Sequence, residues 1–114
     1  MAMKQRLLPA AGAVLAALGV MAQAYAAHAP GAELMRTGGL FLLIHGVALI
    51  AISAFAYRLL KAGALLLGAG TALFAADLAM RAVYERSLFP FAAPIGGSAM
   101  ILAWFLAALG FVLG

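Results

Sequence analysis

The chain alternates between long apolar stretches and short polar links. Four stretches of about 20 residues carry almost no charge, which suits a helix that rises 1.5 Å per residue across about 30 Å of hydrocarbon. No stretch alternates with a period of two, and a lone strand in lipid would leave its backbone groups unbonded. The pattern predicts an all-α protein with four transmembrane helices, at about residues 7–27, 39–57, 62–80 and 95–113.

The links between these stretches set the expected topology. Residues 28–38 and 81–93 form two longer polar links, and the run Arg58-Leu59-Leu60-Lys61 is interpreted as a tight connection. Short links favour antiparallel neighbours, so an up-down-up-down four-helix bundle is expected. Pro94 is predicted at the start of the last helix, where the N–H that proline lacks would be unbonded in any case.

The first stretch has a second interpretation. Lys4 and Arg6, an apolar run and small-residue triplets such as Ala22-Gln23-Ala24 are also typical of a secretory signal peptide that is cleaved. The apolar run is about twice as long as the core of a signal peptide, which favours a membrane span.

Small residues recur seven positions apart in every stretch. Helices in lipid associate through close van der Waals approach, which small residues permit. A seven-residue period keeps one side of a helix facing its neighbour in a left-handed bundle, although an Ala- and Gly-rich chain can produce such spacing by chance. The predicted positions are Gly12, Gly19, Ala26, Gly39, Gly46, Ser53, Gly63, Gly70, Asp77, Gly96, Ala103 and Gly110, with Gly97 added beside Gly96.

Composition agrees with a membrane protein. The chain is 68% hydrophobic and 9% charged, whereas soluble domains are about half apolar and a quarter charged. Its 114 residues leave no room for a soluble domain beside four spans, so a single integral membrane domain over residues 1–114 is predicted. The absence of cysteine excludes disulfides, thiolate metal sites and thiol nucleophiles.

The net charge of +4 comes from basic residues at the ends of the stretches. Such residues anchor helices to headgroups and set their orientation. A small excess on one side favours both termini in the cytoplasm, across a bacterial cytoplasmic membrane, and no basic face is left for nucleic acid. Lys4, Arg6, Arg58 and Lys61 lie on the expected inner side, and Arg36, Arg81 and Arg86 on the outer side.

Asp77 and His45 carry most of the candidate chemistry. A carboxylate near mid-span costs about 2.5–3.5 kcal/mol and needs a partner. Arg81, four positions after Asp77, predicts an ion pair at a helix end, and the alternative is a buried proton or ligand site. His45 is expected at a similar depth, where it either bonds Asp77 or, as favoured here, is neutral and bonds a carbonyl or hydroxyl across a helix contact.

The remaining candidates are His28 and Trp104. His28 is placed at the outer end of the first span and completes a candidate polar cluster of His28, His45, Asp77 and Arg81. These ligand types suit zinc or iron, but no local spacing groups them, so no metal or other cofactor is predicted. Trp104 is expected mid-span, where its N–H needs an acceptor, so it is predicted to pack inside the bundle or against a partner.

Several short motifs resemble one family of small bacterial membrane proteins, the YgdD-like proteins of domain of unknown function 423. The ending APIGGSAMILAWFLAA is similar to the closing segment of that family, and Ala27-His28-Ala29 and His45-Gly46-Val47-Ala48-Leu49 resemble its first and second segments. Asp77-Leu78 matches its third segment, although Ala75 and Ala76 replace a small polar pair. The resemblance implies four membrane helices and supplies no activity.

Three classes of function follow. The leading hypothesis is a non-enzymatic accessory or assembly subunit that contacts a larger membrane complex or lipids, with a homo-oligomer left open. The alternative is a small carrier for protons, ions or lipophilic molecules, with Asp77 and His45 lining the path. An enzyme that uses these two residues as an acid–base pair ranks last, because no substrate-binding constellation accompanies them.

Overall fold

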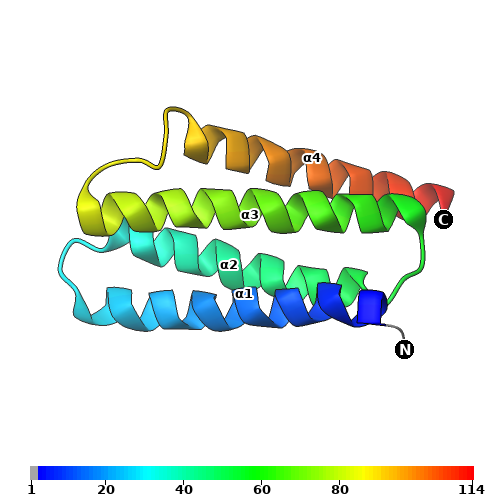
Figure 1. Ribbon diagram of the computed structural model, residues 1–114, viewed down its shortest axis with the longest axis horizontal. Coiled ribbons are helices and arrows are strands. Elements are labelled where there is room, and N and C mark those ends of the chain that lie inside the picture. The colour runs from blue at the N-terminus through cyan, green and yellow to red at the C-terminus, as the bar shows by residue number, and fades with distance from the viewer. Residues whose placement is uncertain (1–2) are drawn as a thin grey trace.

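The computed structural model describes residues 3–114 and contains four α-helices joined by three short links. The helices are α1 (Met3–His28), α2 (Glu33–Ile52), α3 (Arg58–Tyr84) and α4 (Ala92–Leu113). No strand occurs within residues 3–114, and each helix is long and apolar enough to cross a membrane. The prediction of an all-α protein with four apolar helices is confirmed. The chain reverses direction at every link, so the two termini lie at the same end of the molecule (Figure 1).

The boundaries of α2 and the start of α3 differ from the prediction, and both helix starts were misplaced because charged residues were assigned to links. α2 begins at Glu33 and ends at Ile52, earlier at both ends than the predicted 39–57. Glu33 in the first turn complements the helix dipole and pairs with Arg36 at 3.3 Å. The Arg58-Leu59-Leu60-Lys61 run is the first turn of α3, and residues 53–57 form the link instead. Charged side chains are stable in terminal turns because they reach the headgroups.

The α3–α4 link is shorter than the predicted 81–93, because α3 continues to Tyr84 and α4 begins at Ala92. Pro94 lies in the first turn of α4, where the sequence placed it at the start of the helix. The link both begins and ends with a non-glycine residue in the left-handed region, Glu85 at φ 58° and Phe91 at φ 67°. This conformation costs roughly 1–2 kcal/mol per residue, so contacts made by the link must hold it.

Each helix packs chiefly against its neighbour in the chain. α1 packs on α2, α2 on α3 and α3 on α4, with a minor contact between α1 and α3. Within the described residues, no Cα atom of α4 approaches one of α1 or α2 within 8 Å. The molecule is therefore a pair of helical hairpins, α1–α2 and α3–α4, that meet along α2 and α3 (Figure 1). The buried core lies at this junction and includes Leu49, Leu60, Leu67 and Met100.

Glycine pairs bring the backbones of α1 and α2 into direct contact. Gly12 lies opposite Gly46, and a Cβ added at Gly46 would lie 2.5 Å from the Gly12 carbonyl oxygen. Gly19 lies opposite Gly39, where a Cβ on Gly19 would lie 2.6 Å from the Gly39 oxygen. No side chain larger than hydrogen fits at such distances, so the spacing of the hairpin depends on glycine at these positions.

The α3–α4 hairpin is built in the same way. A Cβ on Gly96 would lie 2.8 Å from the Gly70 oxygen, and one on Gly63 would lie 3.2 Å from the Ala103 oxygen. Gly97 lies beside this contact and is not part of it. A Cβ added at Gly97 would have Phe74 Cδ1 as its nearest neighbour, at 4.0 Å. The positions spaced by seven along all four helices are buried, apart from the half-buried Ser53.

Candidate functional site

Asp77 is fully buried, about two turns before the end of α3. Its Oδ2 accepts a hydrogen bond from Arg81 Nε at 2.9 Å, which forms the predicted ion pair. Its Oδ1 accepts a hydrogen bond of 2.8 Å from the backbone N–H of Leu88, in the α3–α4 link. Because both oxygens are engaged, the carboxylate fastens the link, with its two left-handed ends, to the last turns of α3.

His45 lies about three turns inside α2 and is only 6% exposed. Its Nδ1 is 2.8 Å from the carbonyl oxygen of Phe41, and its Nε2 is 3.1 Å from Nε1 of Trp104. A carbonyl only accepts and an indole N–H only donates, so Nδ1 must carry the proton and Nε2 must accept. The contacts thus define a neutral imidazole in one tautomer.

The bond between His45 and Trp104 joins the two hairpins. The α2 and α4 backbones stay apart, so the Trp104 side chain reaches across to α2 while 43% of its surface remains exposed. The ring centroids of His45 and Trp104 lie 5.8 Å apart. The ring of Phe41 stacks on that of His45, with the centroids 5.6 Å apart. Phe41 also packs on Phe74 of α3 at 5.0 Å, so one aromatic group connects three helices.

The structure separates the predicted polar cluster into distinct places. His45 bonds Phe41 and Trp104, and the considered His45–Asp77 bond is absent. The prediction that His45 and Asp77 lie at a similar depth was wrong, because α2 begins at Glu33 and His45 therefore lies about three turns from that end of the molecule, against about two turns for Asp77. The favoured interpretation of a neutral histidine agrees with the contacts, although the carbonyl belongs to its own helix.

His28 is the last residue of α1 and is exposed, away from both polar centres. The polar contacts nearest to it join α1 and α2: Gln23 Nε2 donates to the Arg36 carbonyl at 2.5 Å, and Arg36 Nη2 donates to the Ala26 carbonyl at 3.1 Å. Sequence reasoning missed these contacts and the Leu88 amide. The amide has no side-chain signature, whereas a basic residue in the first turn of α2 was a usable signal for a contact with the end of α1.

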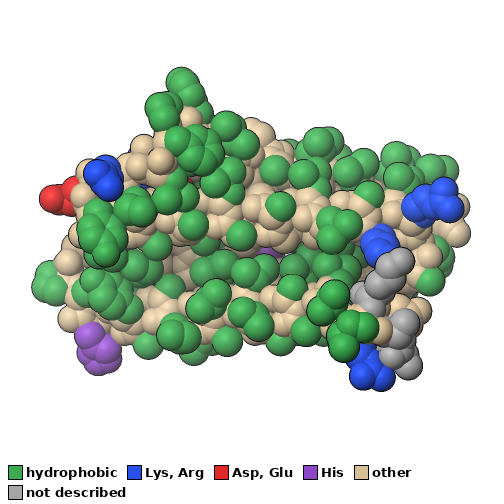
Figure 2. Space-filling model, in the orientation of Figure 1, with side chains coloured by type: hydrophobic (Ala, Val, Ile, Leu, Met, Phe, Trp, Pro, Cys, Tyr) green, Lys and Arg blue, Asp and Glu red, His purple; other side chains and the backbone are tan. Residues whose placement is uncertain are grey.

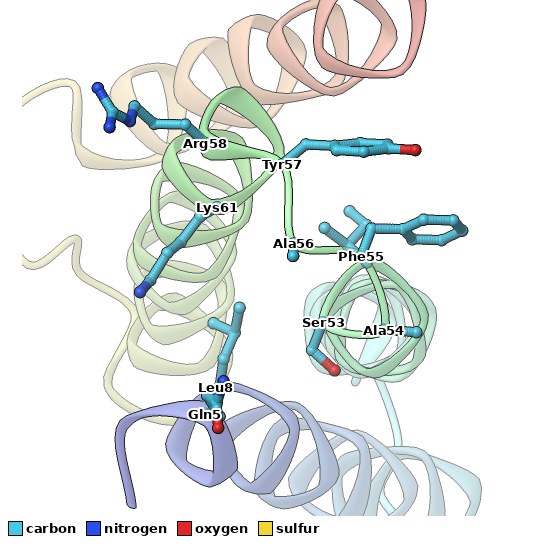
Figure 3. Close-up of a pocket in the computed structure, with 10 residues that line it drawn as sticks. Gln5, Leu8, Ser53, Ala54, Phe55, Ala56, Tyr57, Arg58 and Lys61 are labelled. Carbon is cyan, nitrogen blue, oxygen red and sulfur yellow. The ribbon is translucent and has the colours of Figure 1, made fainter. Parts of the chain in front are cut away.

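Two adjoining hollows lie on the α1 and α3 side of the molecule. We call the first the basic pocket: it measures about 400 Å³, lies at the end that carries both termini, and is bounded by α1, the α2–α3 link and the first turn of α3 (Figure 3). We call the second the apolar groove: it measures about 420 Å³ and runs between α1 and α3, with Leu49 of α2 among its lining residues. Leu8 lines both hollows, so the two adjoin at this residue.

The sequence profile described as "Protein of unknown function (DUF423)" matches residues 15–97, well over half of the chain. The chain belongs to the DUF423 family. The matched region contains His45, Asp77 and Arg81 and ends before Trp104. No curated protein and no solved structure matches the chain. Family membership thus agrees with the resemblance seen in the sequence, and the chemistry must be argued from the contacts.

Those contacts make both polar centres of this DUF423 protein elements that hold helices and links together. Every oxygen of the Asp77 carboxylate and both nitrogens of His45 are bonded to protein groups. In the described part of the chain, His, Asp and Glu side chains form no group of three that could hold a metal ion. The arrangement supports placement of helices better than it supports proton transfer.

Replacing His45 with leucine should leave the Trp104 N–H without an acceptor in an apolar setting. We expect the emission of Trp104, the single tryptophan of the chain, to shift to shorter wavelength, and the free energy of unfolding to fall by about 1 kcal/mol. Fluorescence of the purified protein in detergent measures both effects. His28→Leu, at the exposed end of α1, is the matched control and should leave the emission unchanged. An unchanged spectrum in His45→Leu would contradict the assigned bond.

Thr71 of α3 is fully buried, and its hydroxyl has no hydrogen-bond partner within residues 3–114. Valine has nearly the same shape and removes the unsatisfied group, so we expect Thr71→Val to stabilise the protein by about 1 kcal/mol. Detergent-induced unfolding, followed by Trp104 emission, provides the measurement. Thr71→Ser keeps the hydroxyl and loses a methyl group, so it should be less stable than the wild type. A destabilised Thr71→Val variant would show that the hydroxyl does have a partner.

Proposed function

We propose that this DUF423 protein is a non-enzymatic multi-pass protein of the bacterial cytoplasmic membrane that acts as an accessory or assembly subunit of a larger membrane complex. The observation that carries the proposal is the incomplete packing of α1. Of an apolar stretch of 18 residues in each helix, only 11% is buried within the chain in α1, against 28% in α4, 33% in α2 and 39% in α3. α1 rests almost entirely on α2, which leaves most of its surface open to another protein.

The outer face of α4 adds support. Phe105 is 71% exposed, and Trp104 presents part of its ring outward while its N–H is bonded inward to His45. Aromatic side chains are enriched in protein interfaces, where they bury a large area at low entropic cost. Apolar side chains cover the flank between the two charged ends of the molecule in Figure 2. Two open apolar helices at opposite edges of the hairpin pair suit a subunit that sits between other chains.

The carrier alternative has less support in the geometry. A carrier needs ionisable groups that line a shared path and are free to bind cargo. Asp77 and His45 bond different partners, and none of their polar atoms is unengaged. Asp77→Asn and His45→Ala in liposomes keep the alternative testable, since a loss of pH-dependent flux would favour it.

A photo-crosslinking scan tests the accessory role. A photoreactive amino acid is placed in turn at Val14, Leu18 and Met21 of α1 and at Phe105 and Leu109 of α4, all of them exposed. The proposal predicts a discrete protein adduct of constant mass from positions on one helix face, and none from buried Leu49. Adducts to lipid alone at every position, together with a chain that migrates alone after extraction in mild detergent, would overturn it.

For orientation, we propose that the helices cross the membrane up-down-up-down with left-handed packing and with both termini in the cytoplasm. In the fold, Arg36, Arg81 and Arg86 share their end of the molecule with all three acidic side chains, Glu33, Asp77 and Glu85. The opposite end holds Lys4, Arg6, Arg58 and Lys61 with no acidic side chain, which strengthens the excess of basic residues expected on the cytoplasmic side.

Because the chain has no cysteine, single-cysteine variants report orientation directly. Ala29→Cys and Ser87→Cys lie in the links at one end, and Ala54→Cys lies in the link at the other. In intact cells, a membrane-impermeant maleimide should label the first two and should label Ala54→Cys only after the cells are opened. The reverse pattern would place the termini outside the cytoplasm.

A further inference from the structure

We propose that the basic pocket and the apolar groove together form a binding site for one anionic phospholipid, with the phosphate in the pocket and an acyl chain in the groove. The inference rests on the proposed placement in a membrane and names a lipid partner for it.

The pocket offers positive charge with no acidic side chain nearby. Arg58 and Lys61, one turn apart on α3, both line it, and all three Asp and Glu residues lie at the other end of the molecule. Lys61 extends along the side of the pocket toward α1, whereas the Arg58 side chain points away from it (Figure 3). Both side chains are on exposed residues and are long enough to turn toward a phosphate at the surface.

The backbone at the start of α3 also favours an anion. Tyr57 precedes α3 in an extended conformation, with no side-chain hydrogen bond to cap the helix, and the first turn holds no acidic residue. The uncapped N–H groups of a helix N-terminus carry partial positive charge and bind phosphate groups in many proteins. The N-terminus here reinforces the two basic side chains that line the same hollow.

The apolar groove begins where the basic pocket ends. Lys61 of the pocket is followed on α3 by Ala64, Leu65 and Gly68 of the groove, which lie one and two turns further along the helix. On α1, Leu8 is shared by both hollows, and Ala11 and Leu15 continue the wall. A basic pocket beside an apolar groove is complementary to a phospholipid near the membrane surface, which has a charged headgroup and an apolar chain.

The length of the groove favours a lipid over a partner helix. From Lys61 to Ala69, the last lining residue on α3, the rise is about 12 Å, somewhat less than the half-thickness of the hydrocarbon. A transmembrane helix of a partner would need a face that runs through about 30 Å. One acyl chain of the leaflet on the side of the termini fits the shorter groove.

The test compares phosphatidylglycerol with phosphatidylcholine, which differ in net charge, by native mass spectrometry of the full chain. We expect one phosphatidylglycerol bound in preference to phosphatidylcholine. Arg58→Gln with Lys61→Gln should weaken phosphatidylglycerol binding roughly 25-fold, because each basic group near an anionic surface contributes about fivefold. Arg86→Gln, a basic residue at the other end of the molecule, is the control and should bind as the wild type does.

A second pair of variants tests the groove. Ala11 of α1 and Ala69 of α3 are exposed residues on opposite walls of the groove. The double variant Ala11→Leu with Ala69→Leu fills the groove with larger side chains and should weaken the binding of both lipids. Ala72→Leu, an exposed position of α3 that does not line the groove, should have no effect. An unchanged Trp104 spectrum verifies the fold of each variant.

The lipid site would be overturned by equal binding of the two lipids or by wild-type affinity in the double glutamine variant. It would also be overturned if soluble glycerol phosphate, at the same concentration as the lipid, displaced the bound lipid. The last would show that the phosphate is recognised without the groove. If these results occur while the crosslinks of α1 or α4 persist, the lipid site alone is wrong. A bound lipid without any protein adduct would instead overturn the accessory role alone.

Discussion

Replacing Gly46 with alanine is expected to lower the free energy of unfolding by about 2–3 kcal/mol, in the upper range for overpacked sites. The new Cβ would lie 2.5 Å from the Gly12 oxygen and 2.6 Å from the Ala16 nitrogen, and both are backbone atoms that no rotamer change can move. α1 and α2 would have to separate along the whole hairpin. Detergent-induced unfolding, followed by Trp104 emission, measures the loss.

Gly97→Ala is the matched control for this substitution. It introduces the same methyl group within α4, where the nearest atom is Phe74 Cδ1 at 4.0 Å. Alanine has a higher helix propensity than glycine, so this variant should be as stable as the wild type or more stable by up to about 1 kcal/mol. Similar stabilities for Gly46→Ala and Gly97→Ala would mean that the α1–α2 contact does not depend on its glycines.

Removing the carboxylate with Asp77→Ala is expected to cost about 2–3 kcal/mol, chiefly because the Leu88 N–H loses a charged acceptor. The ion pair adds less, since the Arg81 side chain is 41% exposed and can turn to water. The α3–α4 link should loosen, so hydrogen exchange at the Leu88 amide should speed up together with the loss of stability.

Two further variants separate the parts of this effect. Asp77→Asn keeps an oxygen for the Leu88 N–H and removes the charge, so it should lose about half as much stability and retain most of the protection at Leu88. Arg86→Gln changes a charge in the same link without touching Asp77 and serves as the control. Unchanged exchange at Leu88 in Asp77→Ala would show that the carboxylate does not hold the link.

Sequence spacing was informative where a residue type has one physical use. Glycine at Gly12, Gly19, Gly46 and Gly70 has no side chain to pack, so a regular spacing indicated close backbone approach, and these positions are buried. Asp77 and Arg81 were predictable as a pair because residues four apart on a helix are neighbours.

Spacing was less informative where a residue has two uses. Arg58 and Lys61 suit a link as well as a terminal helical turn, so the start of α3 was predicted too late. The start of α2 was also predicted too late, and His45 was therefore expected to lie less deep than it does. Trp104 was expected to need an acceptor, but identifying His45 requires the spatial relation of α2 to α4, which the pattern of one helix does not contain. The Leu88 amide could not be anticipated at all, because any residue supplies the same donor.

The periodic spacing of small residues also predicts which face of a helix is buried, but it does not predict which helix covers that face. A closed bundle and two adjoining hairpins have the same stripes of small residues, and only the contacts distinguish them. In this protein the glycine contacts Gly46 with Gly12 and Gly96 with Gly70 lie within the hairpins, and α4 makes no close backbone approach to α1 or α2 in the described residues.

The nearest-neighbour packing has a consequence for biosynthesis. Apart from the minor approach of α1 to α3, every helix–helix backbone contact joins segments that leave the ribosome one after the other. α2 can pack on the glycines of α1 as soon as both helices are made, and α4 can do the same with α3, whereas the α2–α3 junction and the His45–Trp104 bond join the two halves of the chain later. Such local pairing has low contact order and spares early segments a long search for a late partner.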